Sequence, residues 1–311
     1  MRIGIDAMGG DKAPKNIVLG AIEAYTQMSP GSRIVLFGDK EQIVKICDEA
    51  GFDHNKLAIA HTTEVIEMSD HPARAFQQKK DSSITVGFKA LYSGDIDGFA
   101  SAGNTGAMLV GTSYTIKSII GIIRPCISAT FPVITGAEGI LLDVGLNPDC
   151  RPDILAQYGI LGSIYATHML NIDNPRIGLL NIGEEEEKGN LLTKAAYELM
   201  KEESYNFIGN IEGRDILSGE KADVIVCDGF VGNVLLKQSE ALYGMAQKLQ
   251  IKHDYFNRFN YELQGGTPVL GVNAPVIIGH GASSPLAIKN MILQTEHAIG
   301  VDLVSKFKEA L

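Results

Sequence analysis

The sequence predicts an α/β protein of three layers, α/β/α, in which helices cover both faces of a Rossmann-like, mostly parallel sheet. Short apolar runs bounded by Gly, Asp and Asn alternate with longer stretches of helical period. This alternation is typical of βαβ units. The 311 residues, 45% of them hydrophobic, can also bury a large core. An ordered enzyme-sized α/β fold is therefore expected.

The predicted elements follow in chain order. The apolar runs predicted as strands are 2–6, 33–37, 96–101, 139–144, 176–182, 224–227 and 275–278. The stretches predicted as helices are 14–28, 40–50, 83–92, 106–117, 152–170, 190–200, 233–249 and 285–299. Several of these helices follow an Asp, Asn, Ser or Gly, the residues that cap a first helical turn.

The sequence shows no clear domain boundary. The chain has no linker rich in Pro, Ser or charge and no internal repeat, so residues 1–311 are predicted to form a single catalytic unit, with two intertwined lobes as the alternative. The segment near 239–266 ends in a polar and aromatic stretch. It is predicted to form a protruding helical arm.

Charge and cysteine usage exclude several classes of function. The net charge of -10 argues against a nucleic-acid partner, which needs clustered Lys and Arg. No stretch reaches the roughly 18 apolar residues of a membrane span, and no secretory leader is apparent, so a cytoplasmic location is expected. The four cysteines form no C-x-x-C pair and the histidines lack zinc-hydrolase spacing, so no metal and no cofactor are predicted.

The loops that follow the strands are the expected place for chemistry, because open parallel sheets bind ligands at the carboxyl ends of their strands. The first loop, DAMGGD, places Asp6 at a strand end, Gly9 and Gly10 in a tight turn, and Asp11 after them. In the loop SAGNTGA at 101–107, Gly103 and Gly106 allow close approach to a ligand, and Asn104 or Thr105 can cap the next helix.

A recurring Gly-Asn pair indicates sites that bind anions. The pair occurs at 103–104, 189–190, 209–210 and 232–233, mostly just before a predicted helix. Free amides and a helix dipole of about half a positive charge stabilise phosphate or carboxylate at such a start. A nucleotide is not indicated, because neither G-x-G-x-x-G nor a Walker sequence is present. The absence of G-x-S-x-G removes the nucleophile-elbow hydrolases.

At these loops the sequence closely resembles the PlsX family of acyl-(acyl carrier protein):phosphate acyltransferases. The resemblance spans nearly the whole chain, and the strings that carry it are DAMGGD at 6–11, KKDSS at 79–83, SAGNTGA at 101–107, RP at 124–125, NPDC at 147–150, PRIGLLNIGEEEEKGN at 175–190, GNIEGRD at 209–215, ADVIVCDGFVGN at 222–233 and HGASS at 280–284. Where many relatives have G-A-N, this chain has Gly145-Leu146-Asn147.

The resemblance implies a homodimer that converts long-chain acyl-carrier protein and inorganic phosphate into acyl phosphate for phospholipid synthesis. The membrane acyltransferase PlsY would consume that product. The implied fold is similar to that of phosphotransacetylase and of the isocitrate and isopropylmalate dehydrogenases. The family also implies peripheral membrane association through the late helical tip. Within enzymes the alternative is a phosphotransacetylase-like acyl-CoA:phosphate transferase, and outside them a non-catalytic scaffold of membrane lipid synthesis.

The residues expected to serve this reaction lie in the same loops. Positioning should dominate catalysis, because the thioester is already activated. The expected catalytic residues are His280, Lys188, Asn233 and Asp228. The expected phosphate or substrate contacts are Gly103, Asn104, Thr105, Gly106, Arg124, Asn147, Asp149, Asn190, Gly232, Lys237 and Ser283. Cys150 and Cys227 raise the further alternative of an acyl-cysteine intermediate.

Overall fold

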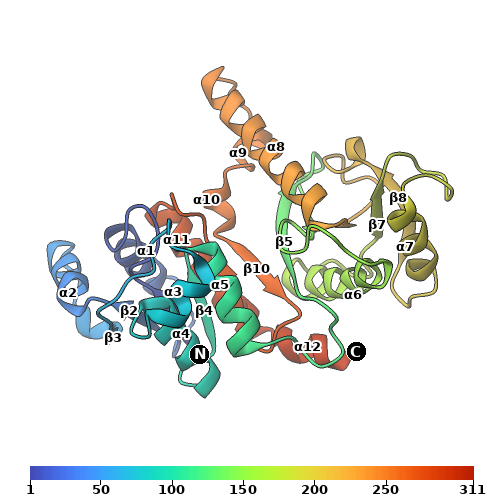
Figure 1. The fold of residues 1–311 in the computed structure, drawn as a ribbon. Coiled ribbons are helices and arrows are strands. Elements are labelled where there is room, and N and C mark those ends of the chain that lie inside the picture. The colour runs from blue at the N-terminus through green and yellow to red at the C-terminus, as the bar shows by residue number, and fades with distance from the viewer. The chain divides into compact units, whose positions relative to one another are not determined.

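The computed structural model describes residues 1–311, which fold into two compact units. Unit 1 comprises residues 1–118 and 261–304, and unit 2 comprises residues 119–260 and 305–311. Figure 1 shows the elements of both, coloured along the chain. The single catalytic unit over residues 1–311 stays a prediction.

Unit 1 contains a sheet in the order β3-β2-β1-β4-β11-β10. Its strands are β1 (Arg2–Asp6), β2 (Arg33–Gly38), β3 (Ala58–His61), β4 (Gly98–Ser101), β10 (Thr267–Leu270) and β11 (Val276–Ile278). All neighbouring strands from β3 to β11 run parallel, and β10 is antiparallel to β11. The carboxyl ends of β1, β4 and β11 therefore share one edge.

Helices cover both faces of this sheet. They are α1 (Lys15–Tyr25), α2 (Lys40–Glu49), α3 (Pro72–Gln78), α4 (Ser83–Ser93), α5 (Thr105–Gly111), α10 (Tyr261–Gln264) and α11 (Pro285–Gly300), with a π-helical turn at Thr112–Ile116. A Cβ on Gly98 would meet α11, whereas the ring of the next residue, Phe99, lies 5.2 Å from that of Phe88 in α4. Because successive strand residues face opposite sides, α11 and α4 lie on opposite faces.

Unit 2 contains a second sheet in the order β5-β6-β9-β7-β8. Its strands are β5 (Cys126–Pro132), β6 (Glu138–Leu142), β7 (Ile177–Asn181), β8 (Phe207–Glu212) and β9 (Val224–Val226). β5 is antiparallel to β6, and the other neighbours are parallel. Its helices are α6 (Pro152–Met169), α7 (Leu191–Lys201), α8 (Gly229–Lys248) and α9 (Asp254–Asn257), and α12 (Leu303–Glu309) spans the boundary between the units.

The predicted mixed α/β fold with a mostly parallel sheet is confirmed, and each predicted strand is present within about two residues at either end. The strands β3, β5, β8 and β10 were not predicted. β8 contains Gly209 and Asn210, and β10 contains Pro268, residues that are rare in strand interiors and mask the apolar pattern. The predicted start of the helix at 233 is wrong, because α8 begins at Gly229.

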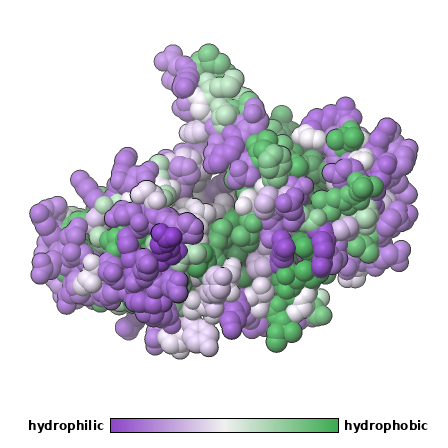
Figure 2. All heavy atoms as spheres, viewed as in Figure 1, coloured by the Kyte–Doolittle hydropathy of each residue, from purple (hydrophilic) through white to green (hydrophobic).

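α8 extends beyond the sheet of unit 2 and exposes apolar as well as polar side chains along its length (Figures 1 and 2). Its outer part carries exposed Leu242 and Met245, and Leu249 follows its end. Judged by length and hydropathy together, every helix of the structure falls short of a membrane span.

Candidate active site

In unit 1 the loops after β1, β4 and β11 lie against one another. The amide of Asp11 donates to the carbonyl of Gly281 at 2.8 Å, and a Cβ on Gly9 would meet the backbone nitrogen of Gly103 at 2.8 Å. Real side chains do not tolerate so close an approach, so this contact requires glycine. The first loop thus presents its backbone to each of the other two loops at the predicted sheet edge.

Asp6 joins the first loop to the second. Its buried carboxylate accepts from the Ser101 hydroxyl at 2.6 Å and from the Met8 amide at 3.0 Å. The Ser101 oxygen in turn accepts from the Gly103 amide at 2.9 Å. Burial raises the pKa of Asp6, and the bond from Ser101 opposes that rise. Asp6 therefore positions the loops and is not available to a ligand.

Asn104 caps α5 as the sequence predicts. Its Oδ1 accepts from the Ala107 amide at 3.0 Å, while Nδ2 donates to the carbonyls of Glu67 at 3.0 Å and Asp70 at 3.1 Å. The side chain is thus fully occupied by protein. What remains for a ligand are the backbone amides of Thr105 and Gly106, which belong to the group that a helix start leaves unpaired.

Gly106 has a packing reason of its own, because a Cβ there would collide with the ring of Pro72 in α3. Glycine at this position therefore does not by itself indicate a ligand.

His280 follows β11 and is exposed to solvent. Its Nδ1 accepts from the Ala282 amide at 3.2 Å, and its ring centroid lies 5.0 Å from that of Tyr261. With Nδ1 accepting, the neutral ring carries its proton on Nε2, which can donate to an anion. The buried Ser283 instead donates its hydroxyl to the His280 carbonyl at 2.5 Å, which fixes the turn.

In unit 2 the loop after β6 folds around the fully buried Asp143. One carboxylate oxygen accepts from the amides of Ile127, Gly145 and Leu146 at 3.1, 3.3 and 3.2 Å. The other accepts from Asn147, from its backbone amide at 2.7 Å and its side chain at 3.0 Å. Five donors thus hold this carboxylate, and Asn147 is a structural partner of it.

The start of α8 packs against the same loop. Asp228 caps the helix by accepting from the Val231 amide at 2.9 Å, and the Gly229 amide donates to the Asn147 carbonyl at 2.8 Å. Gly232 and Asn233 lie one turn further on, inside the helix. The prediction that they form a helix start with free amides is therefore wrong. Asn233 Nδ2 instead donates to the carbonyl of Val144 at 3.1 Å.

The cationic residues predicted to contact phosphate differ in their surroundings, although all three are exposed. Lys237 is paired with Glu240 at 2.9 Å on α8. Arg124 donates through Nη1 to the carbonyl of Asp149 at 3.5 Å, and Asp149 is itself exposed. The Lys188 side chain lies beside Gly183 in the loop after β7.

The thiols near Asp143 are poor nucleophiles. Burial raises the pKa of Cys150 to about 11, and it raises the pKa of Cys227 well above its usual range. Cys150 donates to the Asn147 carbonyl at 3.5 Å, and Cys227 to the Asp143 carbonyl at 3.6 Å. Both remain thiols near neutral pH, which disfavours the acyl-cysteine alternative.

A cavity of about 470 Å³ opens in unit 2 at the carboxyl ends of β7 and β9. Its lining combines the strand-end loops with apolar side chains that the sequence analysis did not single out. The lining residues are Leu155, Leu179, Leu180, Asn181, Ile182, Gly189, Asn190, Thr193, Gly213, Cys227, Asp228, Val231 and Leu235. Two predicted site residues, Asn190 and Asp228, thus face one cavity.

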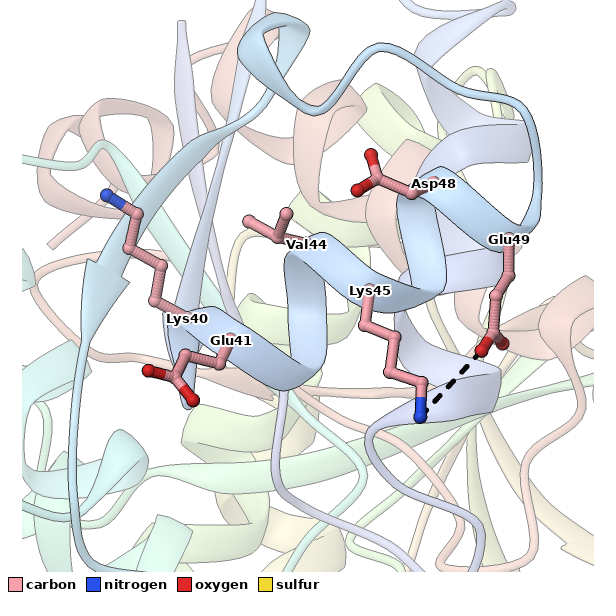
Figure 3. A pocket seen from close by; sticks show the side chains of 6 residues that line it. All are labelled: Lys40, Glu41, Val44, Lys45, Asp48 and Glu49. Atoms are coloured by element: carbon pink, nitrogen blue, oxygen red, sulfur yellow. Dashed lines mark ion pairs between the residues drawn. The ribbon is translucent and has the colours of Figure 1, made fainter.

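A second hollow, of about 610 Å³, lies along the outer face of α2 in unit 1 (Figure 3). All its lining residues belong to that one helix, and all but Val44 are charged, with Lys45 and Glu49 paired at 3.9 Å. This is a solvated helix face, and we assign it no ligand.

One acidic cluster has the spacing of a metal site. Single carboxylate oxygens of Glu184, Glu212 and Asp215 lie within 4.8 Å of one another. Lys221, however, is bonded to Glu184 at 2.6 Å and to Asp215 at 3.1 Å, and Arg214 pairs with Glu212. Two side-chain cations thus already balance these carboxylates.

The chain is similar over its full length to curated phosphate acyltransferases, and most of it matches one family model. Residues 1–254 match the model of a family described as fatty acid synthesis protein. A phosphate acyltransferase of Thermoanaerobacterium thermosaccharolyticum is 44% identical over 330 residues, covering 100% of this chain and 97% of that protein. A phosphate acyltransferase of Dictyoglomus turgidum is 41% identical over 331 residues, covering 100% and 98%.

Solved structures share the fold at low identity. A phosphotransacetylase from Streptococcus pyogenes superimposes with a TM-score of 0.69 at 17% identity, covering 96% of this chain and 94% of that one. The EutD phosphotransacetylase from Staphylococcus aureus gives 0.65 at 16% identity with the same coverage. The likeness to phosphotransacetylases predicted for the fold is confirmed.

Proposed function

Because the chain belongs to the fatty acid synthesis protein family, we propose that it transfers a long-chain acyl group from acyl carrier protein to inorganic phosphate. It is an acyltransferase. The observation that carries the proposal is the full-length similarity to curated phosphate acyltransferases, 40–44% identical. The product, an acyl phosphate, would supply phospholipid synthesis.

The proposed reaction needs no covalent enzyme intermediate. A phosphate oxygen attacks the thioester carbonyl carbon, and the carbonyl electrons move to oxygen in a tetrahedral intermediate. That intermediate collapses by breaking the C–S bond, which gives acyl phosphate and a thiolate that takes up a proton. The raised pKa values of Cys150 and Cys227 support this direct route.

In unit 1 we assign the anion contact to the backbone amides of Thr105 and Gly106 and to Nε2 of His280. The polar ties of Asp6 and Asn104 hold the surrounding backbone in place before a ligand arrives. Correct positioning is worth about 7–11 kcal/mol in the best case, and an oxyanion donor about 3–4 kcal/mol. Donors that are already fixed suit a reaction in which positioning dominates.

In unit 2 we assign Lys188 and Arg124 as the cations that attract phosphate, with Lys237 less favoured because Glu240 already pairs with it. Asn190 would hold the loop of Lys188 through its cap on α7, and Asp228 would fix the start of α8 through its cap there. Gly103, Asn147, Asp149, Gly232, Asn233 and Ser283 then support the backbone of the loops.

The partners remain predictions: acyl carrier protein as donor, a second copy of the chain in a homodimer, the membrane acyltransferase PlsY as consumer of the product, and peripheral membrane attachment through the arm near 239–266. The exposed Met245 and Leu249 support an apolar contact at this arm.

The direct test is to incubate the purified chain with palmitoyl-acyl carrier protein and labelled inorganic phosphate. We expect labelled palmitoyl phosphate together with free carrier protein. Palmitoyl-CoA serves as the competing donor. Equal or faster turnover of palmitoyl-CoA would contradict the proposed donor, and the absence of any acyl phosphate would contradict the reaction.

His280→Gln should lower kcat by about a hundredfold, because Nε2 would no longer donate a proton to the leaving thiolate. The matched control is His297→Gln, an exposed histidine on α11. Steady-state kinetics with phosphate as the varied substrate check both variants. If His280→Gln turned over like His297→Gln, the assignment of His280 would be wrong.

A further inference from the structure

We propose that the 470 Å³ cavity of unit 2 holds the hydrocarbon chain of the acyl donor. This inference rests on the proposed function, and it assigns a role to the apolar side chains of a cavity whose lining also includes the predicted site residues Asn190 and Asp228. The cavity lies between α6, β7 and α8, on the side where β7 and β9 end.

The deep part of the cavity is apolar. Leu155 of α6 and Leu179 of β7 line it and are 1% and 0% exposed. Leu180 and Leu235 add partly buried surface, and Ile182 stands at the solvent side with 79% exposure. Leucine and isoleucine thus line the cavity from its interior to its mouth.

The charge of the lining favours a hydrocarbon over an anion. Asp228 is the one carboxylate of the lining, and no Lys or Arg belongs to it. The carboxylate of Asp228 is held by the Val231 amide at the α8 start. A phosphate or nucleotide is normally held by cationic side chains, which this lining lacks.

The polar groups lie together and define an orientation. Asn190 and Thr193 form a capping box at the start of α7, and Asn181 donates to the carbonyl of Lys188 at 3.2 Å. These residues flank the loop between β7 and α7, which contains Lys188, a cation that we assign to phosphate. We infer that the thioester end of the donor lies at this polar side and the chain runs toward Leu155 and Leu179.

The volume fits a flexible lipid chain. Ligand cavities typically measure about 300–1,000 Å³, and this one lies within that range. Each methylene buried in such a site improves binding by about fourfold. We therefore expect kcat/KM to rise from octanoyl to lauroyl to palmitoyl donors.

Gly213 offers a way to fill the cavity without disturbing the fold. It lines the cavity, its φ lies outside the left-handed region, and a Cβ built on it meets no atom within 4 Å. Gly213→Phe should lower kcat/KM for palmitoyl-acyl carrier protein by about 10-fold to 100-fold, because the ring displaces several methylenes. Octanoyl-acyl carrier protein should change by no more than about twofold.

Two controls accompany this variant. Gly213→Ala is the size control and should retain the full preference for long chains. Gly244→Phe places the same ring at the other glycine of ordinary φ where a Cβ meets no atom, on α8 and away from the cavity. A uniform loss at all chain lengths in Gly213→Phe, or no loss at any, would overturn the assignment.

A binding measurement separates this inference from the proposed reaction. Fluorescence of cis-parinaric acid should rise on binding to the wild-type chain and fall when palmitate competes, with weaker binding to Gly213→Phe and to a second cavity-filling variant, Leu235→Phe. Fatty-acid binding without acyl phosphate formation would refute the proposed function and leave the cavity assignment intact. Acyl phosphate formation with equal probe binding in all variants would refute the cavity assignment alone.

Discussion

Asp6 and Asp143 occupy the same kind of place in the two units and are held in different ways. Each is a buried aspartate at the end of a parallel strand. Asp6 relies on the hydroxyl of another loop, that of Ser101, whereas all but one of the five donors to Asp143 are backbone amides. Unit 1 therefore fixes its loop through the pair of side chains Asp6 and Ser101, whereas unit 2 fixes its loop mainly through bonds from backbone amides to the single side chain of Asp143.

This difference predicts how each loop responds to substitution. Leu146 contributes only its amide to Asp143. Its side chain takes no part in that carboxylate's contacts. We therefore expect the loop after β6 to tolerate substitution of the Leu146 side chain, and the loop in unit 1 to need Asp6 and Ser101 together.

The largest effect should come from removing the carboxylates. Asp143→Ala leaves buried amides unpaired and should cost about 4–5 kcal/mol in the free energy of unfolding. Asp6→Ala should cost about 2 kcal/mol, because fewer donors lose their partner than in Asp143→Ala. Urea unfolding gives both values. Equal losses for the two variants would contradict this difference between the units.

The helix caps should show the same contrast at smaller size. Asn104 ties α5 to the carbonyls of Glu67 and Asp70 besides capping it, whereas the exposed Asn190 only caps α7. Asn104→Ala should therefore cost about 2–3 kcal/mol and Asn190→Ala about 1 kcal/mol. Thermal unfolding of the two variants measures the difference, and a larger loss for Asn190→Ala would reverse our ranking.

The smallest effect is a difference in pH dependence. Burial raises the pKa of Asp6 above its ordinary value of 3.8, so the folded state binds more protons than the unfolded state and stability falls as the pH rises above that value. For Asp223, burial would raise the pKa, but the bonds from Arg176 at 2.8 and 3.0 Å hold it below 3.8. That contribution is complete above 3.8 and is lost as the pH falls through the folded pKa.

Two variants separate these slopes, which cannot exceed about 1.4 kcal/mol per pH unit for one group. Asp6→Asn should gain stability relative to wild type as the pH rises from 3.8. The deficit of Asp223→Asn should shrink as the pH falls below 3.8. Denaturant titrations across this range test both, and parallel curves for wild type and variant would contradict the corresponding shift.

The fold could be predicted where local pattern and burial agree. β1 and β2 are continuous apolar runs between turn residues, and both were placed within one residue. The strands β5 and β8 were not predicted. β5 (Cys126–Pro132) contains Ser, Thr and Pro, and β8 (Phe207–Glu212) contains Gly and Asn, which interrupt the apolar pattern. These strands depend on their neighbours in the sheet, which a local pattern does not contain.

The candidate site was predictable at its loops and not at its cavity. Parallel strands bring their carboxyl ends together by rule, so the contact between the loops of Asp11 and Gly281 followed from the strand assignments. The wrong start of α8 arose because Gly232-Asn233 looks like a cap, whereas Asp228 provides the real one. Leu155 and Leu235 look like any core leucine, and only the structure places them around a cavity.

The order in which the chain crosses between its units has a consequence for its synthesis on the ribosome. Unit 1 is interrupted by residues 119–260, so β11, the neighbour of β4, emerges only after nearly all of unit 2. Until then β4 presents an unpaired edge in the nascent chain, an aggregation hazard that folded proteins normally avoid. Unit 2 is nearly continuous and can fold as it emerges. The half of the molecule that begins first is therefore the half that is completed last.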